Sequence, residues 1–350
     1  MNHRLVWPHL MHCVLWGFAL CALSCGPAED RPRVVVYVSA DDYVARPILD
    51  RFQNETGITV EALYDTEATK TTGLVSRLVA EQTRPRADLF WSSECFRMIE
   101  LQEAGVLGRF PPDQMRALTE GIPSGWCSTE DAWIAVAPRA RVIVYASDRL
   151  EQKDVPSTWE GLTDPRWNGR LAMADPRFGT TGGHFGAMHA AWGAERYGRW
   201  VDGLLDNDVA VLTSGNAGVV EGVASGEFDL GMTDTDDVWA ARERGLDVAL
   251  IYPRHEPPSV PGGGTLLIPN TIGVINGAAH PESALALAQW LASPEVEQML
   301  MESPSRNIPL RSDPGTLAVP DPLQVELESA SLQRAAALEA MRRRGLFESS

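Results

Sequence analysis

The sequence has little positive charge, and almost none of it comes from lysine. Lys70 and Lys153 are the two lysines among 350 residues, and 47 acidic side chains outnumber 30 basic ones, which gives a formal net charge of −17. A protein that binds nucleic acid needs basic patches that neutralise phosphates. The charge balance therefore argues against nucleic acid as a partner.

Long apolar runs are absent after the first 24 residues. The run at the start, residues 13–23 (CVLWGFALCAL), follows Arg4 and has the length of the apolar region of a signal peptide. It is too short to span a bilayer, because a transmembrane helix needs about 20 apolar residues. We therefore expect an exported protein from which residues 1–24 are removed.

The residues that end this run resemble the lipobox of bacterial lipoproteins. Positions 22–25 read ALSC, with Ala22 where lipoboxes usually have Leu. We expect Cys25 to carry the lipid and the polar residues 25–32 to act as a tether, so that a lipid anchor is the protein's one attachment to the membrane. The protein would then lie in the periplasm or on the outer face of the cell membrane. An ordinary cleaved signal peptide with an incidental cysteine is the alternative.

Cysteine is also scarce in the rest of the chain. Cys95 and Cys127 are the remaining two, and the sequence leaves open whether they form a disulfide in an oxidising compartment. About 325 residues follow the signal peptide, more than one hydrophobic core usually holds, so we expect two domains.

Short apolar segments alternate with amphipathic ones along the chain, which predicts strands and helices in turn. The pattern runs through the first third and restarts after residue 170, so we predict an α/β fold of two doubly wound lobes. The predicted strands are 34–38, 58–63, 87–91, 132–136, 141–145, 170–174, 209–212, 228–232, 266–268 and 272–275. The predicted helices are 43–56, 69–82, one from about 181, one from about 217, 281–292 and a tail within 320–344 that packs on the outside.

Oxygen-rich residues follow four of the predicted strands. Ligands of open α/β sheets bind beyond the carboxyl ends of the strands, so we expect these residues to share a cleft between the lobes. They are Asp41 and Asp42, Ser93 and Glu94, Thr180 and Thr181, and Asp234, Thr235 and Asp236.

Two of these segments predict opposite poles. The segment 179–182 (GTTG) offers backbone N–H groups at a helix start and two hydroxyls, which suit an anion. Asp234 and Asp236 repel one another, so their concentration favours a metal ion or an ammonium group among them. Each segment taken alone also fits an ordinary helix N-terminus.

Patterns typical of enzymes are missing. The sequence has no G-x-S-x-G, H-E-x-x-H or P-loop pattern, and the histidines after residue 24 lack metal-site spacing. We expect these histidines at the surface or at helix caps; they are His184, His189, His255 and His280. An extracytoplasmic enzyme that uses the acidic cluster with a divalent metal is the alternative to a binding protein.

Several longer segments carry a resemblance to a known family. They include VVVYVSADDYVARPILDRFQNETGITV, ADLFWSSECFRMIELQEAGVL, TDPRWNGRLAMADPRFGTT and SGNAGVVEGVASGEFDLGMTDTDD. In this order they resemble the class II periplasmic solute-binding proteins of ABC importers, in the branch of ferric-ion-binding and iron-deficiency-induced proteins. The resemblance implies a monomer, not an enzyme, that closes two lobes on a ligand and passes it to an importer permease.

The resemblance also implies how the chain divides. The last strand and the alanine-rich helix would complete the first lobe, so that it comprises 33–137 plus 269–315, and the second lobe comprises 138–268. Two crossovers near Val136 and Leu267 would join the lobes, and 316–350 would form a helical C-terminal segment.

The resemblance assigns roles within the cleft. Thr180, Thr181 and Asn216 fall where the family holds the anion that accompanies its metal, and Arg141 and Tyr145 match a basic residue and a tyrosine that line the cleft. The metal ligands that it implies are Asp42, Glu94, Tyr145 and Asp236, with Asp41 and Ser93 as neighbours.

The chain departs from the family at one point. The adjacent tyrosines that bind ferric ion align with Thr235 and Asp236. Carboxylates are still hard oxygen ligands, so ferric iron with an accompanying anion is the first interpretation, and no other cofactor is expected. An organic zwitterion, such as a phosphonate, or a polyamine-type solute is the alternative.

The anchoring hypothesis makes a prediction for Cys25. Replacing Cys25 by Ser removes the thiol that accepts the lipid, so the variant should be soluble or unprocessed while the wild-type protein partitions with membranes. Cell fractionation measures this. Equal membrane association of the two proteins would contradict lipidation.

Overall fold

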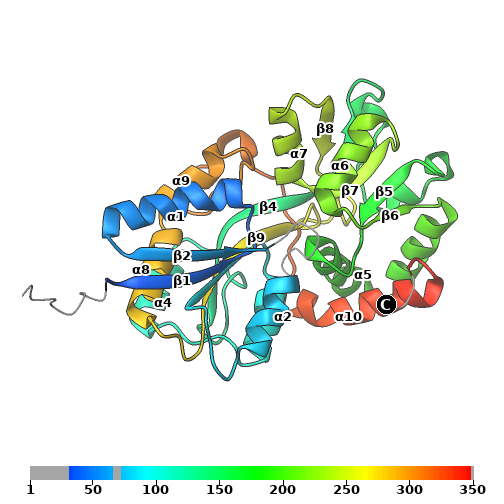
Figure 1. Cartoon of the computed structure of the whole chain (residues 1–350). Helices are drawn as coiled ribbons and strands as arrows, with labels where there is room; N and C mark the ends of the chain where they lie inside the picture. Colours follow the sequence, from blue (N-terminus) through cyan, green and yellow to red (C-terminus); the bar gives the residue numbers. More distant parts are fainter. Residues whose placement is uncertain (1–30, 66–71, 348–350) are drawn as a thin grey trace, which may run out of the picture. The chain divides into compact units, whose positions relative to one another are not determined.

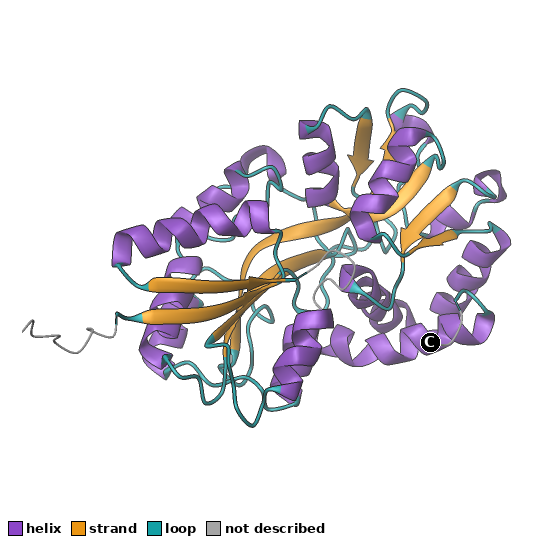
Figure 2. Ribbon diagram, in the orientation of Figure 1, coloured by secondary structure: helices purple, strands orange, loops and turns teal. Residues whose placement is uncertain are grey.

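Nine strands form one mixed sheet in the part of the chain that the computed structural model describes, residues 31–65 and 72–347 (Figures 1 and 2). The order is β2-β1-β3-β9-β4-β7-β5-β6, and β8 pairs with β4. The strands are β1 (Arg33–Val38), β2 (Thr59–Tyr64), β3 (Leu89–Ser92), β4 (Trp133–Ala146), β5 (Leu171–Ala174), β6 (Ala210–Leu212), β7 (Leu230–Asp234), β8 (Val248–Ile251) and β9 (Leu267–Val274).

The helices begin and end where their sequences dictate. α1 stops at Gly57, whose φ of 73° suits glycine and whose N–H donates to the Gln53 carbonyl. α9 has a proline in its first turn, and the Ser293 hydroxyl caps it by accepting from the Val296 N–H. The helices are α1 (Asp42–Thr56), α2 (Thr72–Ala80), α3 (Phe96–Glu103), α4 (Pro112–Leu118), α5 (Gly179–Asp206), α6 (Gly215–Ser225), α7 (Thr235–Glu243), α8 (Pro281–Leu291), α9 (Pro294–Glu302) and α10 (Leu327–Arg344).

Two strands connect the two lobes of this α/β fold. β1 pairs in parallel with β2 and β3 in the first lobe, and β5 pairs in parallel with β6 and β7 in the second. β4 pairs with β9 along its first part and with β7 and β8 along its last part, so it runs from one lobe into the other. The doubly wound α/β class predicted from the sequence is confirmed, and the sheet runs through both lobes.

The structure corrects the prediction of four short strands in this region. The segments 132–136 and 141–145 belong to one strand, β4, and 266–268 and 272–275 belong to β9. Pro138 does not end β4, because the ladder shifts register between Val136 and Arg139, and this irregularity leaves out the residue that cannot donate a hydrogen bond. The bulge also redirects the strand just before Arg139.

The predicted helices lie where the structure has helices, but two of them begin later than predicted. α2 begins at Thr72, and the predicted residues 69–71 lie outside the described part of the chain. The tail helix begins at Leu327 rather than near residue 320, because Pro320 and Pro322 cannot donate backbone hydrogen bonds. No helix of the described residues is both long and apolar enough to cross a membrane, and the expected signal peptide lies outside them.

Helices of the two lobes pack directly on each other beside the sheet. A Cβ added at Gly183 in α5 would lie 1.9 Å from the Phe96 ring in α3, so only glycine permits this approach. α10 lies along α5 in Figure 1 and also reaches α3, where the Ser331 hydroxyl donates to the Phe96 carbonyl at 3.3 Å. The C-terminal helix therefore contacts both lobes.

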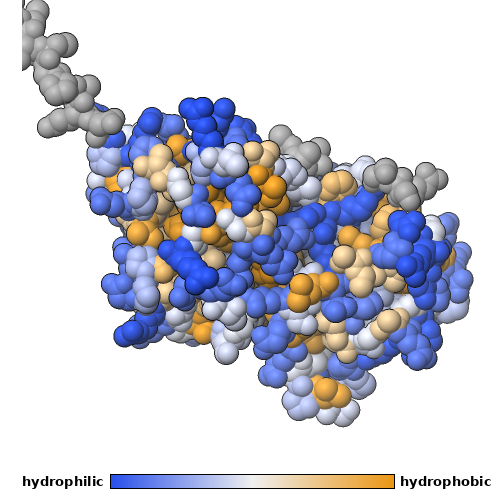
Figure 3. Space-filling model, turned by 90° about the horizontal axis from the view of Figure 1, so that it is seen from below, coloured by the Kyte–Doolittle hydropathy of each residue, from blue (hydrophilic) through white to orange (hydrophobic). Residues whose placement is uncertain are grey.

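Polar and hydrophobic residues mix on the face of the molecule that Figure 3 shows. In the view of Figure 3, hydrophobic residues lie in patches separated by hydrophilic ones. Cys95 and Cys127 both have free thiols, so they do not form the disulfide that the sequence left open. Burial raises the pKa of the Cys127 thiol to about 11, so it stays protonated at neutral pH.

The prediction that the histidines lie at the surface or at caps is wrong for two of them. His184 and His255 are fully buried in the second lobe, and their Nε2 atoms are 2.9 Å apart. The Gly264 carbonyl accepts from His255 Nδ1, so the shared hydrogen bond needs His255 Nε2 as acceptor and His184 Nε2 as donor. Burial lowers the pKa of His184 well below its usual value and lowers the pKa of His255 to about 4.

This pair predicts a loss of stability in acid. The unfolded chain takes up a proton on His255 below pH about 6.5 while the folded chain resists it down to about 4. Stability therefore falls across that window, by about 3 kcal/mol for this residue. Denaturant unfolding at several pH values should show a smaller fall for His255→Gln than for wild type. His189→Gln, on the same helix as His184, is the control and should keep the wild-type slope. An equal slope in His255→Gln would contradict the assignment.

Candidate functional site

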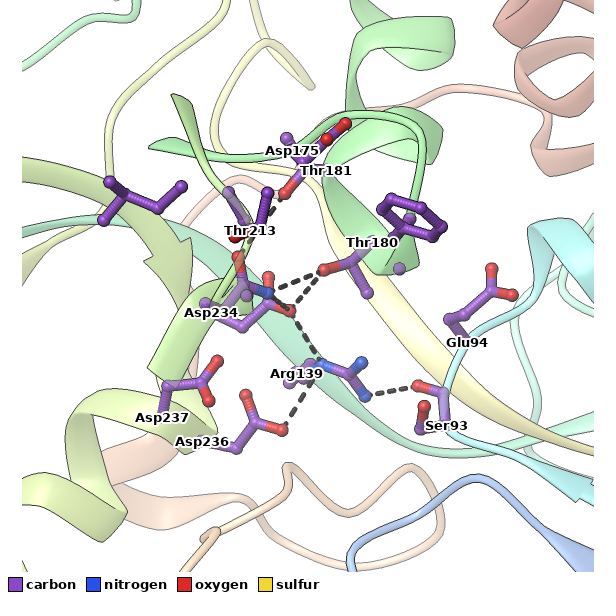
Figure 4. Close-up of a pocket in the computed structure, with 16 residues that line it drawn as sticks. Ser93, Glu94, Arg139, Asp175, Thr180, Thr181, Thr213, Asp234, Asp236 and Asp237 are labelled. Atoms are coloured by element: carbon purple, nitrogen blue, oxygen red, sulfur yellow. Dashed lines mark hydrogen bonds and ion pairs between the residues drawn. The ribbon is translucent and has the colours of Figure 1, made fainter. Parts of the chain in front are cut away.

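Strand ends of both lobes surround one pocket. Its volume is about 60 Å³, and the segments that follow β3, β5, β6 and β7 line it together with Arg139 of β4 (Figure 4). The polar lining residues are Ser93, Glu94, Arg139, Asp175, Thr180, Thr181, Thr213, Asn216, Asp234, Asp236 and Asp237. This is the position at which open α/β sheets bind their ligands.

Asp234, the last residue of β7, holds the centre of the pocket. Its carboxylate is 1% exposed and accepts hydrogen bonds from Arg141 Nη1 at 2.8 Å, Arg139 Nε at 3.1 Å, the Thr180 hydroxyl at 2.6 Å and the Asn216 amide at 2.9 Å. Burial alone would raise the pKa of Asp234, but the two guanidiniums and the Thr180 hydroxyl outweigh it and lower this pKa below its usual value. Asp234 is therefore ionised, and its oxygens are engaged within the protein.

Arg139 joins the two lobes at this point. Figure 4 shows its side chain between Asp234 and Asp236 of the second lobe and the backbone of Ser93 in the first lobe. Arg139 Nε lies 3.4 Å from an Asp236 oxygen, and Arg139 Nη1 donates to the Ser93 carbonyl. Burial would lower the pKa of Arg139, but Asp236 and Asp234 raise it further above its usual value. The guanidinium thus stays charged.

Three helices of the second lobe begin at the pocket wall. α5 starts at Gly179, α6 at Gly215 and α7 at Thr235, and no side-chain hydrogen bond caps any of the three. The N-terminus of a helix carries a partial positive charge and backbone N–H groups that bind anions. The pocket wall at Thr180, Thr181 and Asn216 is therefore suited to an anion.

Carboxylates gather where β7 passes into α7, and one of them, Asp234, accepts from Thr180 and Asn216 of this wall. One oxygen from each of Asp234, Asp236 and Asp237 lies within 4.8 Å of the others, close enough to share a metal ion. Asp234 is bound to two arginines. The carboxylate oxygens that a ligand would reach are therefore those of Asp236 and Asp237. The Tyr43 phenol of the first lobe donates to Asp41 at 3.3 Å, and burial and Asp41 raise its pKa above the usual value; Asp236 and Asp237 add to this, against a hydrogen bond to Ser305.

A second, smaller cavity lies on the other side of Arg139. Its volume is about 20 Å³, and Ser93, Arg139 and Asp236 line it as well as the main pocket. Its remaining polar residues are Asp41, Asn270, Ser305 and Asn307. The Arg139–Asp236 ion pair therefore separates two chambers of one cleft.

The structure brings most of the sequence-predicted residues to this cleft. Ser93, Glu94, Thr180, Thr181, Asn216, Asp234 and Asp236 line the main pocket, and Asp41 lines the smaller cavity. The fully buried Glu94 carboxylate accepts from the backbone N–H groups of Phe96 and Arg97, and burial raises its pKa. Thr235 is buried, and its hydroxyl accepts from the Ala140 N–H, which fixes β4 against α7.

Three predicted residues lie elsewhere or act differently. Asp42 is exposed at the start of α1 and pairs with Arg46 at 3.3 Å, so it does not reach the pocket. Tyr145 lies in the hydrophobic core of the second lobe. Arg141 is fully buried behind the pocket wall, where it pairs with Asp234 instead of lining the cavity.

Sequence reasoning missed Arg139, Asp175 and Tyr43, and it recognised Asp237 as part of the acidic run 233–237 without counting it among the site residues. Arg139 was visible as a basic residue beside a proline within an apolar strand. Asp175 follows β5 as Ser93 follows β3, but it pairs with Arg177 at 2.5 Å. Tyr43 gave no signal, because its approach to Asp236 depends on how the lobes meet.

With this geometry established, comparison with known proteins identifies the family. The pattern of bacterial extracellular solute-binding proteins matches residues 34–303. The chain belongs to this family, which acts outside the cytoplasm.

Relatives and solved structures agree with this assignment. The chain is 25% identical over 297 residues to "Iron uptake protein A1" of Synechocystis sp., covering 80% of this chain and 79% of that protein. It is 24% identical over 273 residues to the "Major ferric iron-binding protein" of Neisseria meningitidis, covering 76% of this chain and 78% of that protein. It is also 24% identical over 299 residues to the "Putative 2-aminoethylphosphonate-binding periplasmic protein" of Salmonella typhimurium, covering 83% of each chain. Iron-bound HitA from Pseudomonas aeruginosa has the same fold, with a TM-score of 0.76 at 23% identity over 90% of this chain and 99% of that one.

We predict that removing the charge of the Asp234 carboxylate greatly lowers the stability of the protein. Asp234→Asn leaves two buried guanidiniums without their shared counter-ion, which should lower the free energy of unfolding by about 3–5 kcal/mol. Asp237→Asn, in the first turn of α7, is the matched control and should stay within about 1 kcal/mol of wild type. Chemical denaturation measures both; an Asp234→Asn variant as stable as the control would show that Asp234 does not hold the site together.

Proposed function

We propose that the protein captures a metal ion, ferric iron, together with a small anion in this pocket and delivers both to an ABC importer. The observation that carries the proposal is the pairing of Asp236 and Asp237 with an uncapped wall of helix N-termini across one small cavity. The names of the similar proteins support it, since they include an iron uptake protein and a ferric iron-binding protein. We infer from this role that the protein is a carrier and not an enzyme.

The charges of the pocket fit an ion with an anion. The acidic cluster of Asp234, Asp236 and Asp237 against Arg139 and Arg141 carries one net negative charge, not counting Glu94 and the Asp175–Arg177 pair of the same pocket. A trivalent ion would turn this into two net positive charges, which a divalent anion beside Thr180 and Thr181 would cancel. A buried site must be close to neutral, because uncompensated charge in a low dielectric is costly.

The size of the pocket also favours small ligands. About 60 Å³ holds roughly four to six water molecules, since one water needs about 10–15 Å³ of such volume. A hydrated or anion-bound ion fits this space in the present arrangement. A larger organic solute would need the lobes to move apart or the Arg139–Asp236 pair to open.

The ligand set would differ from the tyrosine pair of the family. Asp236 and Asp237 would supply carboxylate oxygens, which are hard donors suited to a trivalent ion. Tyr43 is close enough for the charges of Asp236 and Asp237 to raise its pKa, and it would supply a phenolate if the metal drew it in and displaced its proton. The raised pKa of Tyr43 opposes this ionisation while no cation is present.

An organic phosphonate is the second candidate. Arg139 lies within the pocket, and a guanidinium suits a phosphonate group, while Asp236 and Asp237 suit an ammonium group. The similar Salmonella protein is named for such a zwitterion. Elemental analysis of the purified protein separates this candidate from a metal.

The remaining parts of the account are proposals about location and assembly. We propose that the protein is monomeric, is anchored through a lipid on Cys25 and binds an importer permease as its partner. We propose 33–137 plus 269–315 and 138–268 as the lobes that close on the ligand, with β4 and β9 as their connections, and 316–350 as the C-terminal segment.

The proposal predicts which carboxylates matter. Asp236→Asn should weaken ferric iron binding by about tenfold or more, because it removes a charged ligand worth about 1–3 kcal/mol. Its stability without ligand should change little, because the lost ion pair with Arg139 and the relieved repulsion with Asp237 oppose each other. Calorimetric titration with ferric citrate measures the binding.

Asp42→Asn is the control for this experiment. Asp42 is a neighbouring acid of the first lobe that pairs only with Arg46 in the structure, so its loss should leave iron binding unchanged. Unaltered affinity in Asp236→Asn would show that the acidic cluster is a solvated helix start and not a metal site.

A further inference from the structure

The C-terminal helix α10 belongs to the hydrophobic cores of both lobes. Its first half packs with the first lobe, where Leu327 and Ala330 share a core with Phe96 of α3. Its second half packs with the second lobe, where Ala337 and Met341 lie in the core. The helix is therefore a noncovalent connection between the lobes, in addition to β4 and β9.

Glycines of α5 let α10 approach its backbone. A Cβ added at Gly186 would overlap the Ala330 carbonyl oxygen, and one added at Gly182 would lie 2.9 Å from Arg334 Nε. Larger side chains at these two positions would push the helices apart. The start of α5, which forms a wall of the pocket, thus lies directly against α10.

Arg334 of α10 reaches the loop that leads into this wall. Its Nη2 donates to the Arg177 carbonyl at 2.9 Å, and its Nη1 lies 3.3 Å from a Glu100 oxygen of α3. The next three residues of the loop, 178–180, line the pocket, whereas Arg334 lies outside this lining. Its hydrogen bond therefore acts on the wall without contact with the cavity.

Long-range contacts set the position of this loop. It enters α5 through Gly179, whose φ of 57° is readily available only to glycine. The Asp175 carboxylate accepts from the Arg177 N–H at 3.0 Å, and the Arg177 carbonyl accepts from both Arg334 and Arg97, the latter through Nη2 at 3.3 Å. The direction in which the loop enters the helix is thus set from α10 and α3.

The surroundings of Arg334 indicate a role in positioning rather than in stability. The residue is 9% exposed; burial lowers its pKa, Arg97 lowers the pKa further, and Glu100 and Glu94 oppose these effects. A buried guanidinium that shares its carboxylate with a second arginine costs desolvation energy, and an apolar side chain of similar size often packs in such a place without loss of stability. An apolar side chain cannot supply the hydrogen bond to the Arg177 carbonyl.

We propose that Arg334 is a positioning residue for the ligand: it holds the Arg177 carbonyl and thereby sets where Thr180 and Thr181 face the pocket, without touching the ligand itself. The affinity of the cleft then depends on a helix at the end of the chain that lies outside the pocket lining. This role rests on the proposed function, because the two threonines belong to its anion-binding wall.

Two measurements on the full-length protein test this role. They are calorimetric titration with ferric citrate and, without ligand, hydrogen–deuterium exchange of the backbone amides of 183–186, which close the first turn of α5. Arg334→Met removes the donors and keeps the apolar bulk. Its amides of 183–186 should exchange at least about tenfold faster than in wild type, and its affinity should fall about tenfold, as expected for a lost hydrogen bond to a buried carbonyl.

Arg334→Lys separates the hydrogen bonds from the charge. Lysine keeps the positive charge on a shorter side chain without the planar fork that reaches Arg177 and Glu100 together. Affinity and exchange should therefore lie between those of wild type and Arg334→Met. Wild-type values for both would show that the position of the guanidinium does not matter.

Arg344→Met is the matched control. Arg344 lies on the same helix and pairs at 2.7 Å with Asp202, at the opposite end of α5 from the pocket. The variant thus removes the same charge from the same pair of helices. It should bind ferric citrate as wild type does and keep the exchange rates of 183–186.

The outcomes distinguish this role from the proposed function. Wild-type affinity in Arg334→Met, or weaker binding with unchanged exchange at 183–186, would overturn the role of Arg334. If Arg334→Met does not fold, wild-type behaviour of Arg334→Lys would overturn it as well. Absence of ferric citrate binding by the wild-type protein would contradict the proposed function, while the exchange rates would still decide whether Arg334 holds the wall.

Discussion

The shared ion pair of Asp234 with Arg139 and Arg141 is the interaction on which the rest of the cleft depends. One buried carboxylate neutralises two buried guanidiniums and also accepts from Thr180 and Asn216, so it fixes β4, α5, α6 and β7 relative to one another. Burying such an ion pair costs desolvation energy. Removing one partner by mutation costs still more stability, because the other charge is left buried without a counter-ion. This buried ion pair, called the floor of the pocket below, holds the groups that face a ligand in fixed positions around it.

This floor decides which groups remain for a ligand. Asp234 is used within the protein, so Asp236 and Asp237 supply the accessible negative charge, and the uncapped starts of α5 and α6 supply the positive potential. Arg139 lies where these regions meet and extends the same ion pair to the first lobe through Ser93. A ligand that alters the Arg139 contacts would therefore alter both the buried ion pair and the contact between the lobes.

The sequence predicted the fold well because buried strands and amphipathic helices leave a strong local pattern. It predicted strand ends as the site for the same reason, and Thr180, Thr181, Asn216 and Asp236 all reach the pocket. It failed where the outcome depends on long-range packing. Arg141 and Tyr145 lie on one strand, but the burial of β4 between β9 and β7 turns one into a structural ion pair and the other into core. The register shift before Arg139 and the buried pair of His184 and His255 both arise from the meeting of distant segments, which no local pattern records.

The central claim is that Asp236 and Asp237 bind a metal while the helix starts bind its anion. Anomalous diffraction at the iron absorption edge, from crystals of protein loaded with ferric iron and bicarbonate, tests it most directly. The account predicts one iron peak coordinated by Asp236 and Asp237, with a small anion against Thr180 and Thr181. A pocket without an iron peak that instead holds an organic solute, with its acidic group on Arg139, would contradict it.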